Sequence, residues 1–188
     1  MLDAVERLMV TEGYASVSYR AVAAGVGVTS GLVQYYFPAL DDLLEAAVRR
    51  RAEENLERLA AALADRPDEP LHVIWAASRE EASAVLMTEF LALGNHRKSI
   101  RTVIAEVSER SRQVQVKALR AAGVGKEQGL RPEEIAFLAN GIPKIVGLEA
   151  GAGLATAHDA VMKTCQKYIA VLEPRPGSRP RPTRRRPA

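Results

Sequence analysis

The side chains with the clearest chemical potential stand close together between Thr29 and Phe37. In a helix over this segment, Val33 and Phe37 are four residues apart, so they share one face and we expect them to face inward. The opposite face offers Gly31 and Tyr35, and Ser30, Leu32 and Gln34 flank them. Such side chains at the start of a helix can contact base edges in the major groove of DNA, and glycine lets the backbone come close. Plain exposure to solvent is the alternative.

The rest of the sequence offers no groups spaced for catalysis or metal binding. The three histidines, His72, His96 and His158, are far apart and lack a second ligand at metal-binding spacing. Cys165 is the single cysteine, which excludes an internal disulfide, and its apolar helical stripe favours a core or an interface. Nucleophile–base pairs and phosphate-cradling glycine loops are missing too. We therefore expect no enzyme, no cofactor and no metal.

The elements that must position the 29–37 segment read as helices, because Ala, Leu, Glu and Arg are abundant and no stretch alternates like a strand. Ser18 and Thr29 suit helix N-caps, Gly13 suits a helix stop, and a glycine-rich break falls at 25–28. The three short helices and their tight turns predict a helix-turn-helix. The expected helices are 2–12, 19–25, 30–37, 41–64, 71–77, 80–93, 99–122, 132–152 and 155–172.

The net charge of +3 suggests nucleic-acid binding, but its distribution does not support that reading. The segment 174–188 holds six arginines and no acid, so residues 1–173 carry a net charge of −3. The first 50 residues have four arginines against six acids, a net charge of −2. A DNA-binding hypothesis must therefore rest on the local placement of side chains. The arginine-rich tail is either a solvated segment or a source of sequence-independent attraction to DNA.

Several elements in fixed order give the N-terminal quarter a resemblance to the TetR family of transcription regulators. They are Glu12-Gly13-Tyr14, the run from Val22 to Gly31, Tyr35-Tyr36-Phe37-Pro38 and Leu43-Leu44. The resemblance covers residues 2–48. It implies a three-helix DNA-binding domain whose third helix enters the major groove, and a C-terminal helical domain that dimerises and encloses a ligand cavity. A loose similarity of the 80–96 stretch to BetI-like members names no inducer.

The resemblance also implies which residues contact DNA. Thr29, Ser30, Gly31, Leu32, Gln34 and Tyr35 fall where the family reads bases or nearby phosphates, and Tyr36 falls at a phosphate-contacting position. Ser18, Tyr19 and Arg20 begin the second helix, where backbone contacts are made, although Tyr19 and Arg20 also suit an ordinary surface. The chain departs from the family at Leu40, where many relatives carry lysine, at Gln34, where many carry tyrosine, and in lacking a basic N-terminal arm.

The last two predicted helices carry apolar seams with small residues, which suit either the monomer core or an interface with a second copy. The resemblance favours the interface, because a two-fold operator needs a two-fold protein. For a mainly apolar ligand cavity, we expect a lining that includes one amide. The candidate residues are Trp75, Met87, Phe90, Phe137 and Asn140, each of which is alternatively plain core.

The sequence therefore predicts an all-α chain in three parts: a helix-turn-helix domain over 1–45, a helical ligand-binding and dimerisation domain over 46–173, and a disordered Arg/Pro-rich tail over 174–188. The expected function is a ligand-responsive transcriptional regulator in the cytoplasm. We expect a homodimeric repressor that a small-molecule effector releases from a palindromic DNA operator, with no membrane contact. The alternative is a helical small-molecule-binding protein whose DNA binding is weak or lost. The operator, the effector and the direction of regulation are not determined by the sequence.

Overall fold

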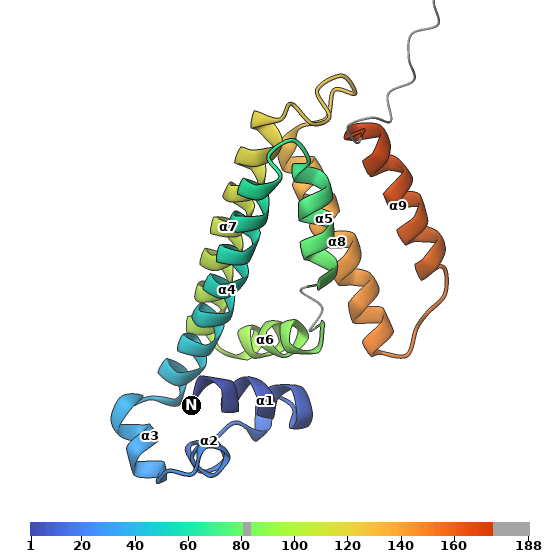
Figure 1. The fold of residues 1–188 in the computed structure, drawn as a ribbon. Helices are drawn as coiled ribbons and strands as arrows, with labels where there is room; N and C mark the ends of the chain where they lie inside the picture. Colours follow the sequence, from blue (N-terminus) through green and yellow to red (C-terminus); the bar gives the residue numbers. More distant parts are fainter. Residues whose placement is uncertain (81–83, 175–188) are drawn as a thin grey trace, which may run out of the picture.

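A computed structural model of the chain describes residues 1–80 and 84–174, and these residues fold into helices joined by short connections (Figure 1). The predicted all-α fold is confirmed for this part of the chain. The helices are α1 (Leu2–Glu12), the 3₁₀ turn η1 (Tyr14–Ser16), α2 (Tyr19–Val26), α3 (Ser30–Tyr36), α4 (Leu40–Asp65), α5 (Pro70–Glu80), α6 (Ala84–His96), α7 (Lys98–Ala121), α8 (Pro132–Gly151) and α9 (His158–Leu172). No described helix is both long and apolar enough to cross a membrane.

Local capping sets the ends of the first three helices as the sequence predicts. Gly13 ends α1 with a φ of 80°. The hydroxyl of Ser18 accepts the N–H of Ala21 (3.2 Å) at the start of α2, and that of Thr29 accepts the N–H of Leu32 (3.3 Å) at the start of α3. Gly27 ends α2 in the left-handed conformation (φ 71°), which costs glycine little. The turn between α2 and α3 is thus fixed by local chemistry.

Some predicted helix boundaries in the second half are wrong. Helix α5 continues to Glu80 instead of ending at residue 77, because no glycine or proline interrupts the chain there. Helix α6 is described from Ala84 to His96 rather than over 80–93. Helix α9 begins at His158 and not at residue 155, since Ala157 adopts a left-handed φ of 66° just before it. The predicted disordered tail lies outside the described residues, except for Pro174.

The N-terminal helices do not enclose a core of their own. Val5 and Met9 of α1, Val33 of α3 and Leu43 of α4 are buried in one cluster with side chains from α6 and the start of α7. The latter are Leu86, Phe90, Leu93, Ile100 and Val103. Figure 1 shows α6 lying directly above α1, with α2 and α3 below. Because α4 runs without a break through residue 45, the predicted boundary between 45 and 46 falls inside a continuous helix.

A second core holds the C-terminal body together. The end of α4 contributes Leu59 and Leu63, which pack with side chains of α5, α7, α8 and α9. Helices α4 and α7 lie side by side over much of their length (Figure 1). An ion pair between Arg49 Nη1 and Glu106 Oε2 (3.0 Å) links them, as does a paired contact between Arg110 and Glu53. Helix α4 therefore belongs to both cores and connects them rigidly.

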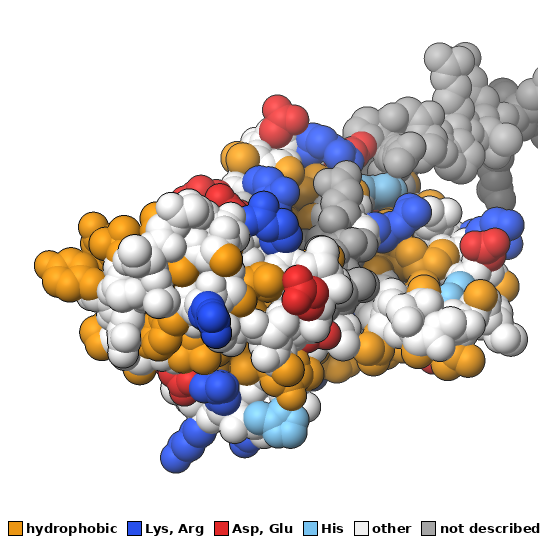
Figure 2. Space-filling model, turned by 90° about the horizontal axis from the view of Figure 1, so that it is seen from below, with side chains coloured by type: hydrophobic (Ala, Val, Ile, Leu, Met, Phe, Trp, Pro, Cys, Tyr) orange, Lys and Arg blue, Asp and Glu red, His pale blue; other side chains and the backbone are white. Residues whose placement is uncertain are grey.

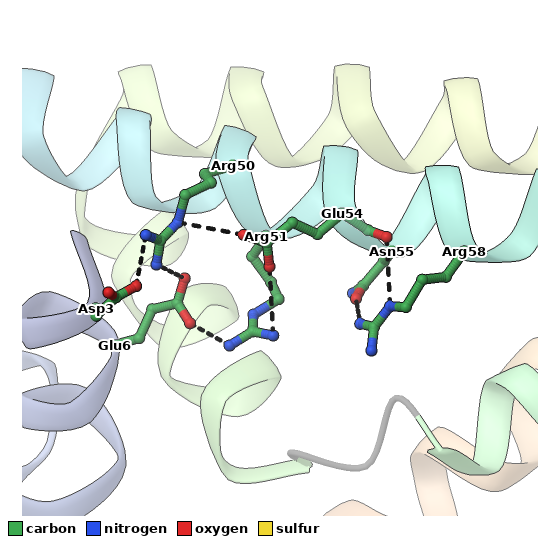
Figure 3. A network of polar contacts seen from close by, with 7 residues as sticks. All are labelled: Asp3, Glu6, Arg50, Arg51, Glu54, Asn55 and Arg58. Atoms are coloured by element: carbon green, nitrogen blue, oxygen red, sulfur yellow. Dashed lines mark hydrogen bonds and ion pairs between the residues drawn. The ribbon is translucent and has the colours of Figure 1, made fainter.

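A buried carboxylate ties α1 to α4 (Figure 3). The side chain of Glu6 is 8% exposed and accepts Arg50 Nη2 at 2.9 Å through one oxygen and Arg51 through the other. Arg50 also pairs with Asp3 at 2.6 Å. The hydrogen bond that Arg50 donates to Glu6 is the largest cause that raises the pKa of Arg50. This network fixes the orientation of α1 relative to α4.

We expect Glu6→Gln to destabilise the fold by about 2 kcal/mol, because both guanidinium groups lose their one buried carboxylate while remaining partly buried. The free energy of unfolding from urea titration measures the effect. Glu54→Gln is the matched control, since Glu54 contacts the same arginines but its side chain is 47% exposed, and we expect a change below about 0.5 kcal/mol. Equal losses in the two variants would contradict the role given to Glu6.

Candidate functional site

Helix α3 presents one face to solvent and packs the other against the N-terminal core. Val33 is fully buried and Phe37 packs partly against the core, as predicted. On the outer face Tyr35 is 78% exposed, Tyr36 is 62% exposed and Leu32 is 40% exposed. The two tyrosine rings lie edge to face with centroids 5.4 Å apart. Figure 2 views the molecule from the α2–α3 side and shows apolar side chains gathered at the α3 end. Packing within the described residues does not account for two large aromatic side chains exposed on so short a helix.

Some of the other residues predicted to contact DNA have exposed side chains, whereas others form hydrogen bonds within the fold. Ser30, Gln34 and Arg20 are exposed. Ser18 and Thr29 are also exposed, but their hydroxyls cap α2 and α3. The hydroxyl of Tyr19 lies 2.8 Å from the carbonyl oxygen of Phe37 and 3.0 Å from that of Pro38, and donates to them. Tyr19 therefore joins the start of α2 to the end of α3.

Gly31 leaves open space on the outer face. A Cβ atom placed there would meet nothing within 4 Å, and its φ lies outside the left-handed region. The backbone of α3 can thus approach a flat or grooved partner at this point without a side chain between them. No requirement of the fold itself explains glycine at this position.

The acidic residues that outnumber the arginines near the N-terminus are mostly bound within the fold. Glu6 is buried against α4, and Asp41 pairs with Arg97 and lies 3.3 Å from the hydroxyl of Ser99. Asp42 accepts the backbone N–H of Ala39 at 2.9 Å. Leu40, where relatives carry lysine, begins α4 and packs on the core. Ion pairs and hydrogen bonds within the fold therefore compensate much of the negative charge of this region.

The structure does not gather the five predicted ligand-binding residues into one cavity. Trp75 lines a cavity between α5, α8 and α9, whereas Met87 lines another between α6 and the end of α8. Phe90 packs in the N-terminal core. Phe137 is 61% exposed and lies under the guanidinium of Arg112, with 5.3 Å from that group to the ring centroid. Helical spacing alone could not reveal that these side chains point in different directions.

Asn140, the predicted amide, belongs to a polar cluster inside the C-terminal body. Its Nδ2 donates to Gln115 of α7 and to the carbonyl of Ala136 (2.7 Å), and the hydroxyl of Ser78 lies 2.9 Å from its Oδ1. Ser78 and Gln115 are both buried. Each polar group of the cluster has a partner, so the cluster orients α5, α7 and α8 relative to one another.

Helices α8 and α9 expose an unusual amount of apolar surface. Six large side chains on these helices are more than half exposed: Phe137, Leu138, Ile145, Leu148, Tyr168 and Val171. Cys165, predicted in a core or an interface, is half-buried at the cavity wall, and burial raises the pKa of its thiol.

The histidines serve as structural partners. His72 pairs with Glu173 and His158 with Glu149, each at 2.7 Å, while His96 stacks on Tyr14. No three potential metal-ligating side chains come together in the part of the chain that the structure describes.

Residues 1–47 match the family model described as bacterial regulatory proteins, tetR family. The comparison with curated proteins gives no match. Among solved structures, a TetR transcription regulator from Haloarcula marismortui ATCC 43049 superposes with a TM-score of 0.71 at 17% identity, covering 91% of this chain and 95% of that one. A transcriptional regulator from Rhodococcus sp. Rha1 gives 0.72 at 20%, covering 91% and 92%. The multidrug binding protein EbrR, complexed with imidazole, gives 0.59 at 27%, covering 94% and 89%.

The chain has an N-terminal helix-turn-helix, formed by α2 and α3, on an all-helical body, and the outer face of α3 is exposed. This is the arrangement of a DNA-binding transcription regulator. The first 47 residues match the TetR family model, and the described residues have a fold similar to that of solved TetR regulators.

Two glycine variants separate a binding role from a folding role. We expect Gly31→Ala to leave the melting temperature unchanged or slightly raised, because alanine suits a helix and has room, while DNA affinity falls because the added methyl group holds the backbone away. Gly27→Ala should instead cost about 1 kcal/mol of stability, because its φ is 71°. Thermal melting and a mobility-shift assay measure both. Full DNA affinity in Gly31→Ala would contradict a close backbone approach at α3.

Proposed function

We propose that this protein is a ligand-responsive repressor that binds a near-palindromic operator as a homodimer, with one α3 helix of each subunit in a major groove. The observation that carries the proposal is the outer face of α3, where Tyr35 and Tyr36 are exposed beside the open Gly31. Phenolic, amide and hydroxyl groups there match the donors and acceptors of base edges and phosphates. The free N–H groups at the starts of α2 and α3 suit phosphate oxygens.

The apolar surface of α8 and α9 supports the homodimer. Large apolar patches on a soluble protein commonly mark an interaction site, and α9 lies along the side of the body opposite α4, away from α3 (Figure 1). A symmetric pairing through them would hold two α3 helices at a fixed separation. Successive major grooves on one side of a duplex require about 34–36 Å between the two reading helices.

The shared N-terminal core supports a response to ligand. Helix α6 packs directly on α1, and Glu89 of α6 accepts the backbone N–H of Tyr14 at 2.5 Å. Arg97, which precedes α7, pairs with Asp41 at the start of α4. A displacement of α6 or α7 by an effector therefore moves the DNA-binding helices as a unit, which changes the distance between the two copies of α3. The imidazole complex of EbrR agrees with a small-molecule effector.

The second candidate function is a helical small-molecule-binding protein with weak or lost DNA binding. The observation in its favour is the small number of cations near α3, where Leu40 replaces a phosphate-contacting lysine of the family. Enrichment of bound fragments from random duplex DNA decides between the two: a specific palindrome supports the repressor, and failure to enrich any sequence supports the second candidate.

The double variant Tyr35→Ala/Tyr36→Ala tests the reading helix. We expect operator affinity to fall at least about 10-fold in a mobility-shift assay, because a lost base contact is worth about 1–3 kcal/mol and the double variant removes at least one such contact. Stability and dimer mass should stay unchanged, since both rings are exposed. Leu91→Ala, an exposed apolar side chain on α6, is the control and should bind normally. Full operator affinity in the double variant would show that α3 is not the reading helix.

Ile145→Glu tests the dimer surface. Ile145 is 58% exposed on α8, so a carboxylate there harms the monomer little but would be desolvated in the proposed interface. We expect the mass measured by light scattering to change from that of a dimer to that of a monomer at micromolar concentration. The neighbouring Lys144→Glu is exposed as well and controls for the added charge. A wild-type chain that is monomeric, or an Ile145→Glu chain that dimerises normally, would contradict the proposed pairing.

A further inference from the structure

A pocket between α5 and α9 is lined by basic side chains, and none of the described residues that line it is acidic. Its volume is about 580 Å³, and its polar lining residues are Arg66, His72, Arg79 and Gln166. His72 and Arg79 are seven positions apart on α5, so they lie on one face of that helix. The charged groups of this wall are therefore guanidinium groups, which attract an anion.

Two carboxylates contact residues of this wall, and both are already bound. Glu173 is buried; it accepts the backbone N–H of His72 at 2.8 Å and lies 2.7 Å from Nδ1 of the same residue. Glu69 accepts Nε (3.2 Å) and Nη2 (2.8 Å) of Arg66, so Nη1 of Arg66 has no partner among the described residues. Arg79 is exposed and forms no ion pair or hydrogen bond with any described residue. The wall thus keeps donors for an anion that comes from outside.

The rest of the lining is apolar. It consists of Trp75 and Ala76 on α5, and of Ile169 and Ala170 on α9. Ala76 and Ala170 are small and exposed, so the groove between the two helices is open to solvent and has room for a ring or a short chain. An occupant with an anionic head and an apolar body therefore finds a matching surface for both parts.

The pocket stays accessible in the proposed homodimer. None of the six large side chains of the exposed apolar surface on α8 and α9 lines it. On α9, Gln166 lies two positions before Tyr168, which places the two residues about 200° apart around the helix axis. The pocket and the apolar surface therefore use opposite sides of α9. The hydrogen bonds from Leu71 (2.9 Å) and His72 to Glu173 tie the end of α9 to the start of α5, which reduces the cost of ordering the site.

We propose that this pocket binds a compact organic anion, with a carboxylate or phosphate head at Arg66 and Arg79 and an apolar body against Ala76 and Ala170. Guanidinium groups present forked donors that suit the oxygens of either head. The inference rests on the proposed function, because it gives the effector of the repressor a chemical class and a position. The occupant contacts both α5 and α9, and α9 carries part of the surface proposed to pair the subunits.

Three probes of similar shape test the chemical class. We would titrate the full chain with cyclohexanecarboxylate, with cyclohexyl phosphate, and with cyclohexanecarboxamide, which resembles the first but has no charge. Calorimetry measures the affinities, and the fluorescence of Trp75, the only tryptophan, reports occupancy because its side chain lines the pocket. We expect both anions to bind and the amide to bind at least about tenfold more weakly, because it forms no charge-assisted hydrogen bonds. The tighter of the two anions identifies the head group.

Two variants locate the binding by charge. Arg79→Gln removes a cation from the wall, and Gln166→Glu adds an acid of nearly the same size. Each should weaken cyclohexanecarboxylate about threefold to tenfold and leave the amide unchanged. Arg120→Gln on α7 and Gln128→Glu in the α7–α8 connection make the same changes at exposed positions outside the pocket, and we expect them to bind as the unaltered chain does. Both pocket positions are exposed, and the melting temperature of each variant checks that its fold is kept.

Equal binding of the amide and cyclohexanecarboxylate, unchanged anion affinity in either pocket variant, or no binding of either anion at millimolar concentration would overturn the inference. Operator affinity measured on the same preparation separates this outcome from a failure of the proposed function. A chain that binds an anion at this pocket but enriches no DNA contradicts the repressor alone. A chain that binds its operator but neither anion contradicts the pocket assignment alone.

Discussion

The position of α3 depends on how α1 is fixed to α4, because a helix of seven residues is not stable alone and takes its orientation from its neighbours. Glu6 provides the polar part of that attachment through Arg50 and Arg51, and the core around Met9 and Leu43 provides the apolar part. A shift in this joint would rotate α2 and α3 together, since Tyr19 and the turn at Gly27 hold them as one unit. The geometry of the outer face is therefore set by residues that lie outside it.

The N-terminal domain is built as part of the body rather than as a separate module. Leu86 and Phe90 of α6 fill the same core as Val5 of α1, and α6 also packs against α7 and α8 of the C-terminal body. Helix α4 spans both cores without interruption. A packed core has few alternative arrangements, so in the proposed function we expect a movement in the body to displace α1 as a rigid unit.

The positions of the charged side chains matter more in this protein than its net charge. Asp3 and Glu6 are bound by arginines of α4 and Asp41 by Arg97, so these acids hold the fold together. In the proposed complex, the described residues near α3 would attract a duplex through helix N-termini, hydroxyl groups, the exposed tyrosines and Arg20. Affinity built in this way is less dependent on salt than affinity built on many lysines.

The sequence by itself determined the helical class, the caps at Ser18 and Thr29, the end of α1 at Gly13, and the outward face of α3. These features depend on interactions within a few residues, and such interactions are visible in the order of the chain. Only the tertiary structure decided that Phe90 joins the N-terminal core, that Phe137 faces outward, and that Trp75 shares a cavity with Cys165, 90 positions along the chain. Helical periodicity shows that a side chain is apolar and on a given stripe. It does not show which distant helix covers that stripe, because that choice depends on how all the helices pack at once.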